Sequence, residues 1–194
     1  MNWTRALHHL RSLADTCADM ATRPVSIYPL RVAELWVAGP VLSGPVEVET
    51  LIVALTVDVE EVPWRTEPAG ARHWAAAARL PHAPVEVFWR STRVPVWNHV
   101  LHRPARVWSA DDGVDERVID RIAEGDAESV RAAAPSEAET RERLAADLAV
   151  SLAGLRDRTA DYQRKRWRPG KLEPVADALW QASDGYLDLL RATN

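Results

Sequence analysis

Apolar residues follow two different periods along the chain, and the change of period marks the predicted elements. Over residues 3–21 they recur every three or four positions, which predicts an amphipathic helix. Residues 50–59 form a nearly continuous apolar and β-branched run, which is typical of a buried central strand. Further elements are expected as strands over residues 31–38, 85–89 and 106–108 and as a short helix over residues 71–80.

From residue 112 onward the helical period predominates. Short helices are predicted over residues 114–124 and 126–134, with Gly125 between them. Ser136 and Glu139 form a capping box that predicts the start of a long helix, and this helix is expected to reach about residue 166. A last helix should begin near Glu173.

The order of elements predicts an α+β fold, with a small mixed β-sheet and a C-terminal helical bundle. Residues 1–110 are expected to form the α/β core. Residues 111–194 are expected to form a helical region packed on it.

Composition and charge exclude several classes of protein. The 194 residues carry a formal net charge of −4, which excludes a protein that binds polyanions by bulk charge, so we expect no nucleic-acid partner. No run approaches 18 apolar residues, so no membrane partner is expected, and the N-terminus lacks a signal-peptide core, which favours a cytoplasmic protein.

The single cysteine, Cys17, lies on the apolar stripe of the first helix and predicts a buried, inert thiol. Most of the nine tryptophans are expected to be buried or half-buried.

The segment with the most chemical information begins where the strand over residues 31–38 ends. Gly39 and Gly44 stand five residues apart, and Glu47 and Glu49 follow immediately before the apolar strand. A glycine turn leaves room for phosphates against backbone N–H groups. Carboxylates two residues apart on a strand face the same side, where they could share Mg²⁺.

This order of turn, carboxylates and strand resembles the nucleotidyltransferase superfold, in particular the minimal and aminoglycoside nucleotidyltransferases. The resemblance implies that Gly39 and Gly44 bind nucleotide and that Glu47 and Glu49 bind Mg²⁺. It also implies that Glu86, on the strand over residues 85–89, is the third, catalytic acid. The C-terminal helices look like the bundle that these enzymes append, and Lys171 at their junction would then contact the triphosphate.

The sequence departs from that pattern in ways that predict weakened chemistry. Pro40 stands where the family has a serine, and proline offers neither a hydroxyl nor an N–H to a phosphate. Glutamates are longer than the family's aspartates, so bound metals would be displaced. The alternative is that Glu47 and Glu49 are solvated hairpin residues. The whole chain also resembles an uncharacterised family of small proteins from GC-rich actinobacteria, which implies no activity.

Two basic stretches also call for an interpretation. Residues 89–108 interleave arginines with tryptophans, a combination that suits nucleotide stacking or single-stranded nucleic acid. The alternative, which we favour, is that the tryptophans pack the core and the arginines pair with the acidic helices that follow. The run over residues 164–171 either binds an anionic ligand or complements a helix dipole.

These residues leave three functions open. The first is an inactive or weakened nucleotidyltransferase-like protein that binds a nucleotide or a protein partner. The second is an active Mg²⁺-dependent nucleotidyltransferase that acts on a small molecule or a protein. The third is an interaction module without a ligand, which uses its helical half as a homodimer face.

Overall fold

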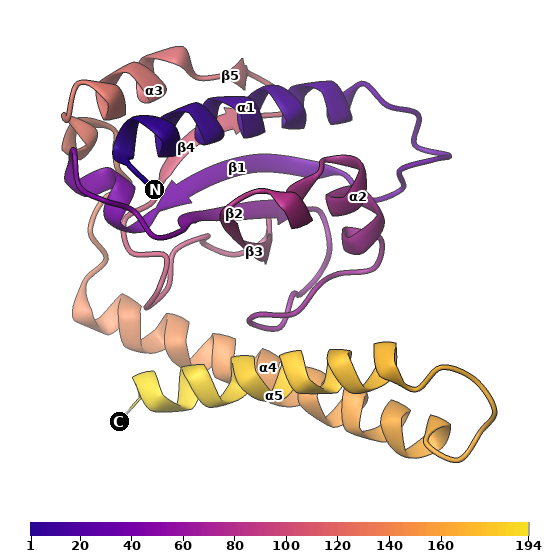
Figure 1. Ribbon diagram of the computed structural model, residues 1–194. Coiled ribbons are helices and arrows are strands. Elements are labelled where there is room, and N and C mark those ends of the chain that lie inside the picture. Colours follow the sequence, from indigo (N-terminus) through magenta and orange to yellow (C-terminus); the bar gives the residue numbers. More distant parts are fainter. Residues whose placement is uncertain (194) are drawn as a thin grey trace.

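A computed structural model describes residues 1–193 as a mixed β-sheet with helices on both faces (Figure 1). The helices are α1 (Trp3–Ala21), α2 (Ala71–Ala77), α3 (Glu116–Ala123), α4 (Glu137–Lys165) and α5 (Glu173–Ala192). The strands are β1 (Val32–Ala38), β2 (Leu51–Val57), β3 (Val85–Ser91), β4 (Ala105–Ser109) and β5 (Gly113–Val114). Three 3₁₀ turns connect them, η1 (Gly39–Ser43), η2 (Leu80–His82) and η3 (Ala127–Val130). Within residues 1–193, no helix has the length and apolar character that crossing a membrane requires.

The five strands lie in the order β3-β2-β1-β4-β5. Strands β2 and β3 run parallel, and each of the other neighbouring pairs runs antiparallel. Strand β2 is central and almost wholly buried, as its continuous apolar run predicts. The predicted α+β class is therefore confirmed, and so are the long helix α4, the last helix α5 and the packing of these two against each other.

One face of the sheet is covered by α1, α2 and α3 (Figure 1). Helix α1 begins at Asn2, whose side chain accepts a hydrogen bond from the backbone N–H of Arg5 at 2.9 Å. The buried stripe of α1 packs against the alternate residues of β1 and β2 that point to this side, and Leu10 and Leu35 at the centre are both fully buried. The apolar residues that recur at the helical period in α1 are therefore the ones that it buries in the core.

The opposite face is covered by the hairpin of α4 and α5 (Figure 1). The segment around Trp64 lies between this hairpin and the sheet, and the indole ring of Trp64 stacks on Phe88 with ring centroids 4.6 Å apart. A Cβ added to Gly185 would lie 2.0 Å from the carbonyl oxygen of Trp64, and one added to Gly154 would lie 2.6 Å from Cγ of Pro63. The two helices can pack this closely on the segment around Trp64 only because each has a glycine at the contact.

Three predicted elements differ from the structure. The helix expected over residues 126–134 is only the short turn η3, because Ala132 donates its backbone N–H to Pro104 at 2.9 Å and the Arg131 side chain donates to the carbonyl of Arg103 at the same distance. The helix expected over residues 71–80 divides into α2 and η2, because Arg79 adopts a left-handed conformation with φ of 57°. Strand β2 begins at Leu51, so Glu47 and Glu49 precede it and do not lie two residues apart on a strand.

Seven of the nine tryptophans are buried or half-buried, as expected, but Trp167 and Trp180 are exposed. Trp180 lies on the outer side of α5, where neither the sheet nor α4 covers it. The sequence pattern shows that α5 has an apolar side, but not that its apolar residues exceed what the core can cover.

Candidate functional site

The glycine turn and the predicted third acid lie at the same edge of the sheet. Gly39 begins η1 directly after β1, with φ of 77°. Ala38 is paired with Ile52 on β2, and Ile52 is paired in turn with Glu86 on β3. A Cβ at Gly39 would lie 2.9 Å from Cδ1 of Ile52, so glycine is needed here both for its conformation and for its size. Gly39 and Glu86 therefore flank one row of side chains.

Glu47 and Glu49 lie in the loop that leads from the buried Gly44 into β2, and both side chains are exposed. Between them the buried Val48 is held by the N-terminus, because the Met1 ammonium donates to the Val48 carbonyl at 2.5 Å and the Val48 N–H donates to the Met1 carbonyl at 2.9 Å. This anchor fixes the loop, but it leaves both carboxylates in solvent. Within residues 1–193, no three side chains of histidine, cysteine, aspartate or glutamate form a group that could hold a metal ion.

Lys171 lies far from this edge. It is exposed in the connection between α4 and α5. Figure 1 shows that connection at one end of the hairpin, whereas the arrowhead of β1 and the turn after it lie toward the other end. The structure thus places Gly39 and Glu86 at one edge of the sheet, Gly44, Glu47 and Glu49 in the loop between β1 and β2, and Lys171 at the connection between α4 and α5.

Glu86 is engaged by an arginine that the sequence did not single out. Nη1 of Arg65 lies 3.5 Å from Oε1 of Glu86, and Nε of Arg65 lies 3.3 Å from Asp188 and 3.8 Å from Asp184 on α5. The Arg65 guanidinium also lies 5.4 Å from the ring centroid of Phe88. The single guanidinium of Arg65 therefore lies within 4 Å of three carboxylates, two of which belong to the helical hairpin.

Asp188 is the polar centre of this contact. It accepts a hydrogen bond from the indole N–H of Trp64 at 2.7 Å and lies 3.2 Å from Nε2 of His99. Burial acts to raise the pKa of Asp188, but the hydrogen bond from Trp64 and the charge of Arg65 outweigh it and hold the pKa below its usual range. These residues are far apart in the sequence and follow no motif spacing, so only the fold could reveal the group.

A second charged group is buried between the sheet and the hairpin. Arg90 on β3 donates from Nη2 to both carboxylate oxygens of Asp147 at 3.2 Å, and Arg143 donates to Asp147 at 2.5 Å. Burial lowers the pKa of Arg90, and the neighbouring Asp147 opposes that shift. The arginines of residues 89–108 do pair with acids, but the prediction that these acids belong to the helices that follow is only partly right. Asp147 lies on α4 and Glu128 on η3, whereas the other pairs, Arg93–Asp58, Arg106–Glu34 and Arg106–Asp112, involve a strand and connecting segments.

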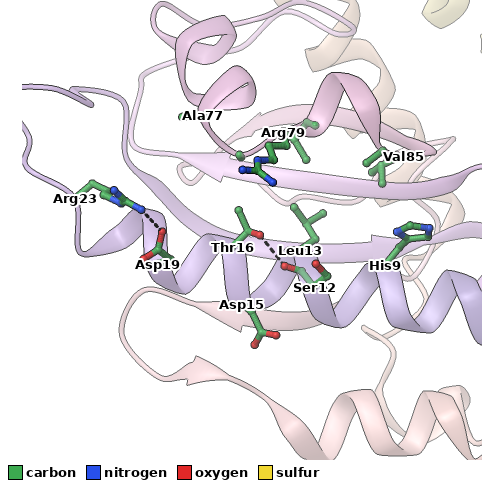
Figure 2. A pocket seen from close by; sticks show the side chains of 13 residues that line it. His9, Ser12, Leu13, Asp15, Thr16, Asp19, Arg23, Ala77, Arg79 and Val85 are labelled. Carbon is green, nitrogen blue, oxygen red and sulfur yellow. Dashed lines mark hydrogen bonds and ion pairs between the residues drawn. The ribbon is translucent and has the colours of Figure 1, made fainter.

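A groove of about 560 Å³ lies on the other side of the sheet, between α1 and the segment that joins α2 to β3 (Figure 2). Leu13, Leu80 and Val85 supply apolar surface. Polar groups enter from both walls, and Figure 2 shows Arg79 lying across the groove from Thr16. The sequence carries no signal for this groove, because its two walls are about 60 residues apart in the chain and contain no recognisable motif.

The outer face of the hairpin carries exposed apolar residues on both helices. On α5, Trp180 is 67% exposed and Leu187 is 46% exposed, and the seven-residue spacing places them on one side of the helix. Alanines occupy the exposed side of α4, at Ala145, Ala149, Ala153 and Ala160. We call this set of six residues the hairpin face.

Comparison with known proteins adds a family but no activity. Searches of curated proteins and of solved structures find no significant match. The model of the family described as "Domain of unknown function (DUF7711)" matches residues 1–194, and the chain therefore belongs to that family.

Proposed function

We propose that this protein is a non-catalytic, nucleotidyltransferase-like protein that acts by self-association through the hairpin face. The observation that carries the proposal is the exposure of Trp180 and Leu187 beside a row of alanines on α4. Large apolar side chains next to small ones make a surface that is complementary to itself, because the large residues of one copy fit against the small residues of the other. Two hairpins packed in this way would form a four-helix bundle.

The nucleotidyltransferase-like part of the proposal is supported by the order of the first three strands. The glycine turn follows β1, the two glutamates precede β2, and the third acid lies on β3, which runs parallel to β2. Gly39 and Glu86 border the same row of paired residues. This is the order that the sequence resemblance implies.

The salt bridge between Arg65 and Glu86 supports the non-catalytic part. In two-metal chemistry the carboxylates must be available to the metal ions and to the attacking hydroxyl. Here the guanidinium of Arg65 neutralises the predicted third acid from 3.5 Å and is itself held by two aspartates of α5. A fixed cation between these carboxylates lowers their affinity for a divalent cation.

The position of Lys171 argues for a protein partner over a nucleotide. A triphosphate at the Gly39 turn would approach the exposed carboxylates of Glu47 and Glu49 without the lysine, which lies at the far end of the hairpin. The negative charges would repel each other unless the Mg²⁺ that the resemblance implies lay between them, and among residues 1–193 no three acidic, histidine or cysteine side chains form a group that could hold such an ion.

Charge along the hairpin favours a second copy of this chain as the partner. Residues 156–177, at the connection, contain seven basic and four acidic side chains. Residues 137–155 and 178–193, at the opposite end, contain six acidic and three basic side chains. Asp147, Asp184 and Asp188 pair with arginines on the side that faces the sheet, and Arg143 is one of these arginines, which leaves three acidic and two basic side chains for the outer side. A two-fold axis through the middle of the hairpin face would place the basic end of each copy on the acidic end of the other, so the charges would be complementary.

The size of the hairpin face is sufficient for a specific dimer. A helix of 20 residues such as α5 is about 30 Å long, and two helices side by side are about 20 Å wide. Such a footprint covers about 600 Å² on each copy, which reaches the lower bound of about 1,200 Å² in total for specific interfaces.

The proposal is tested by the molar mass of the protein in solution, measured by light scattering over a range of concentrations. The wild type should approach twice its chain mass of 21.6 kDa. Trp180→Glu should be monomeric with an unchanged circular dichroism spectrum, because the side chain is exposed in the monomer. Trp167→Glu is the matched control, since Trp167 is 82% exposed but lies outside the hairpin face, and it should remain dimeric. A monomeric wild type, or a dimer that survives Trp180→Glu, would overturn the proposal.

A further inference from the structure

We infer that the groove between α1 and α2 is a binding site for a small organic anion, and that Arg79 recognises its oxyanion group. This inference does not rest on the proposed function, since the groove lies on the opposite face of the sheet from the hairpin. Four observations carry it: the conformation of Arg79, its lack of a protein partner, the apolar groove surface beside it, and a second polar atom without a partner at the same groove.

Arg79 is held in a backbone conformation that side chains other than glycine rarely adopt. Three non-glycine residues among residues 1–193 have positive φ, and all three are arginines: Arg65, Arg79 and Arg103. Interactions explain two of them, because Arg65 is held by carboxylates and Arg103 pairs with Glu128 and donates to the Ala132 carbonyl. Arg79 follows the last turn of α2, where its backbone N–H donates to the Ala76 carbonyl at 3.1 Å and its carbonyl accepts from the His82 N–H at 3.2 Å. A left-handed residue is common at this place, but it is usually glycine, and the Arg79 side chain takes no part in these bonds. Conformations of this kind recur at ligand sites.

The guanidinium of Arg79 makes no hydrogen bond or ion pair with any residue that the structure describes, yet Arg79 lines this groove. Figure 2 shows it reaching over the middle of the groove toward Thr16. The other arginine of the groove, Arg23, is already paired with Asp19 at 2.6 Å. Arg79 is therefore the cation in the groove that is available to an anion, and its planar guanidinium suits the paired oxygens of a carboxylate or a phosphate.

The rest of the groove indicates the shape of the ligand. Leu13, Leu80 and Val85 offer apolar surface beside Arg79, so the anion should have an apolar body. At one end lies His9, whose Nε2 atom is shielded from solvent and has no partner among the described residues. Burial and the nearby charges of Arg5 and His8 lower the pKa of His9, so near pH 7 the ring is neutral and does not add a second cation. The volume of about 560 Å³ is in the range of small-molecule sites.

Calorimetric titration of the full chain with four probes tests the inference. Benzoate and phenyl phosphate combine an oxyanion with an apolar ring, inorganic phosphate lacks the ring, and benzylamine has the ring with a positive charge. We expect at least one of the two ring anions to bind saturably and more tightly than inorganic phosphate, and which of them binds decides between a carboxylate and a phosphate. Benzylamine should not bind.

Variants connect the binding to Arg79. Arg79→Asn keeps a residue that tolerates the left-handed conformation and should weaken binding at least about tenfold, which is the effect expected from a charge-assisted hydrogen bond. Arg117→Gln is the control, because Arg117 is also exposed but lies on α3, and it should bind like the wild type. Arg79→Gly should abolish binding and raise the midpoint of thermal unfolding, since glycine adopts this φ without strain. The inference is overturned if Arg79→Asn binds as tightly as the wild type, or if neither ring anion binds with a dissociation constant below about 1 mM.

Discussion

Replacing Asp147 with alanine should weaken the contact between the sheet and the helical hairpin more than any other single change of a charged residue. Two arginines converge on this carboxylate, and the environment is almost dry, because Arg90 is 1% exposed and Asp147 is 4% exposed. Without the carboxylate, the Arg90 guanidinium would stay buried with the carbonyl of Pro95 at 3.3 Å as its remaining hydrogen-bond partner among residues 1–193.

The magnitude follows from that burial. Removing one partner of a buried ion pair costs about 3–5 kcal/mol, because the other charge is left uncompensated. A domain is stable by only about 5–15 kcal/mol, so Asp147→Ala should lose about a fifth or more of the free energy of unfolding. The double variant Arg90→Met/Asp147→Leu removes the two most buried charges and should recover part of the loss, since apolar pairs of similar size replace buried ion pairs at little cost. Arg143, whose side chain is 10% exposed, loses its carboxylate in both variants, so recovery should not be complete.

Urea unfolding followed by tryptophan fluorescence is the suitable assay, because the ring of Trp64 lies 5.7 Å from the Arg90 guanidinium and reports on this contact. Asp58→Ala is the control: it removes a carboxylate from an exposed pair with Arg93 and should change the free energy of unfolding by less than about 1 kcal/mol. If Asp147→Ala also costs less than about 1 kcal/mol, or if the double variant is the less stable of the two, the reasoning is wrong.

Three further predictions concern other parts of the structure. Gly185→Ala should lower the midpoint of thermal unfolding sharply, since its Cβ would lie 2.0 Å from the Trp64 carbonyl oxygen; a midpoint within a degree of the wild type would contradict that packing. Cys17 is buried and burial raises the pKa of its thiol, so a thiol reagent at pH 8 should modify it only in denaturant, and rapid labelling of the folded protein would refute this. The pKa of Asp188 is held low in the folded state, so its contribution to stability should be full above about pH 4 and should be lost as the pH falls through the folded pKa; Asp188→Asn should therefore flatten the acid limb of the stability curve, and an unchanged limb would count against it.

The sequence predicted the fold well where one physical signal dominated. The stripe of α1, the continuous run of β2 and the capping box at Ser136 each determine an element through local chemistry, and the observed bounds agree closely. The prediction failed over residues 126–134, where local composition favours a helix but hydrogen bonds to Arg103 and Pro104 hold the backbone elsewhere. Such tertiary competition leaves no trace in a periodic pattern.

The candidate sites were harder to predict because they depend on residues that meet only in space. The strands carry Gly39 and Glu86 to one edge of the sheet, and the binding and catalytic roles that the resemblance gives them stay predictions. Nothing in the sequence distinguishes Arg65, the arginine that pairs with Glu86, from the other 21 arginines. Arg79 is equally hard to identify from the sequence, because arginine is not a residue type that predicts a left-handed backbone conformation.

The most direct test of the claim that the acidic edge is not a metal-dependent catalytic site is a thermal-shift series with ATP, GTP, CTP and UTP, each with and without Mg²⁺ or Mn²⁺. A ligand at about 100 times its dissociation constant adds roughly 2.7 kcal/mol, which raises the midpoint of thermal unfolding by about 5–11 °C for a chain of this size. Because Arg65 neutralises Glu86, we expect no metal-dependent rise for any nucleotide. A rise that requires the metal in the wild type and disappears in Glu86→Gln would contradict the claim and would identify the protein as a nucleotide-binding enzyme candidate.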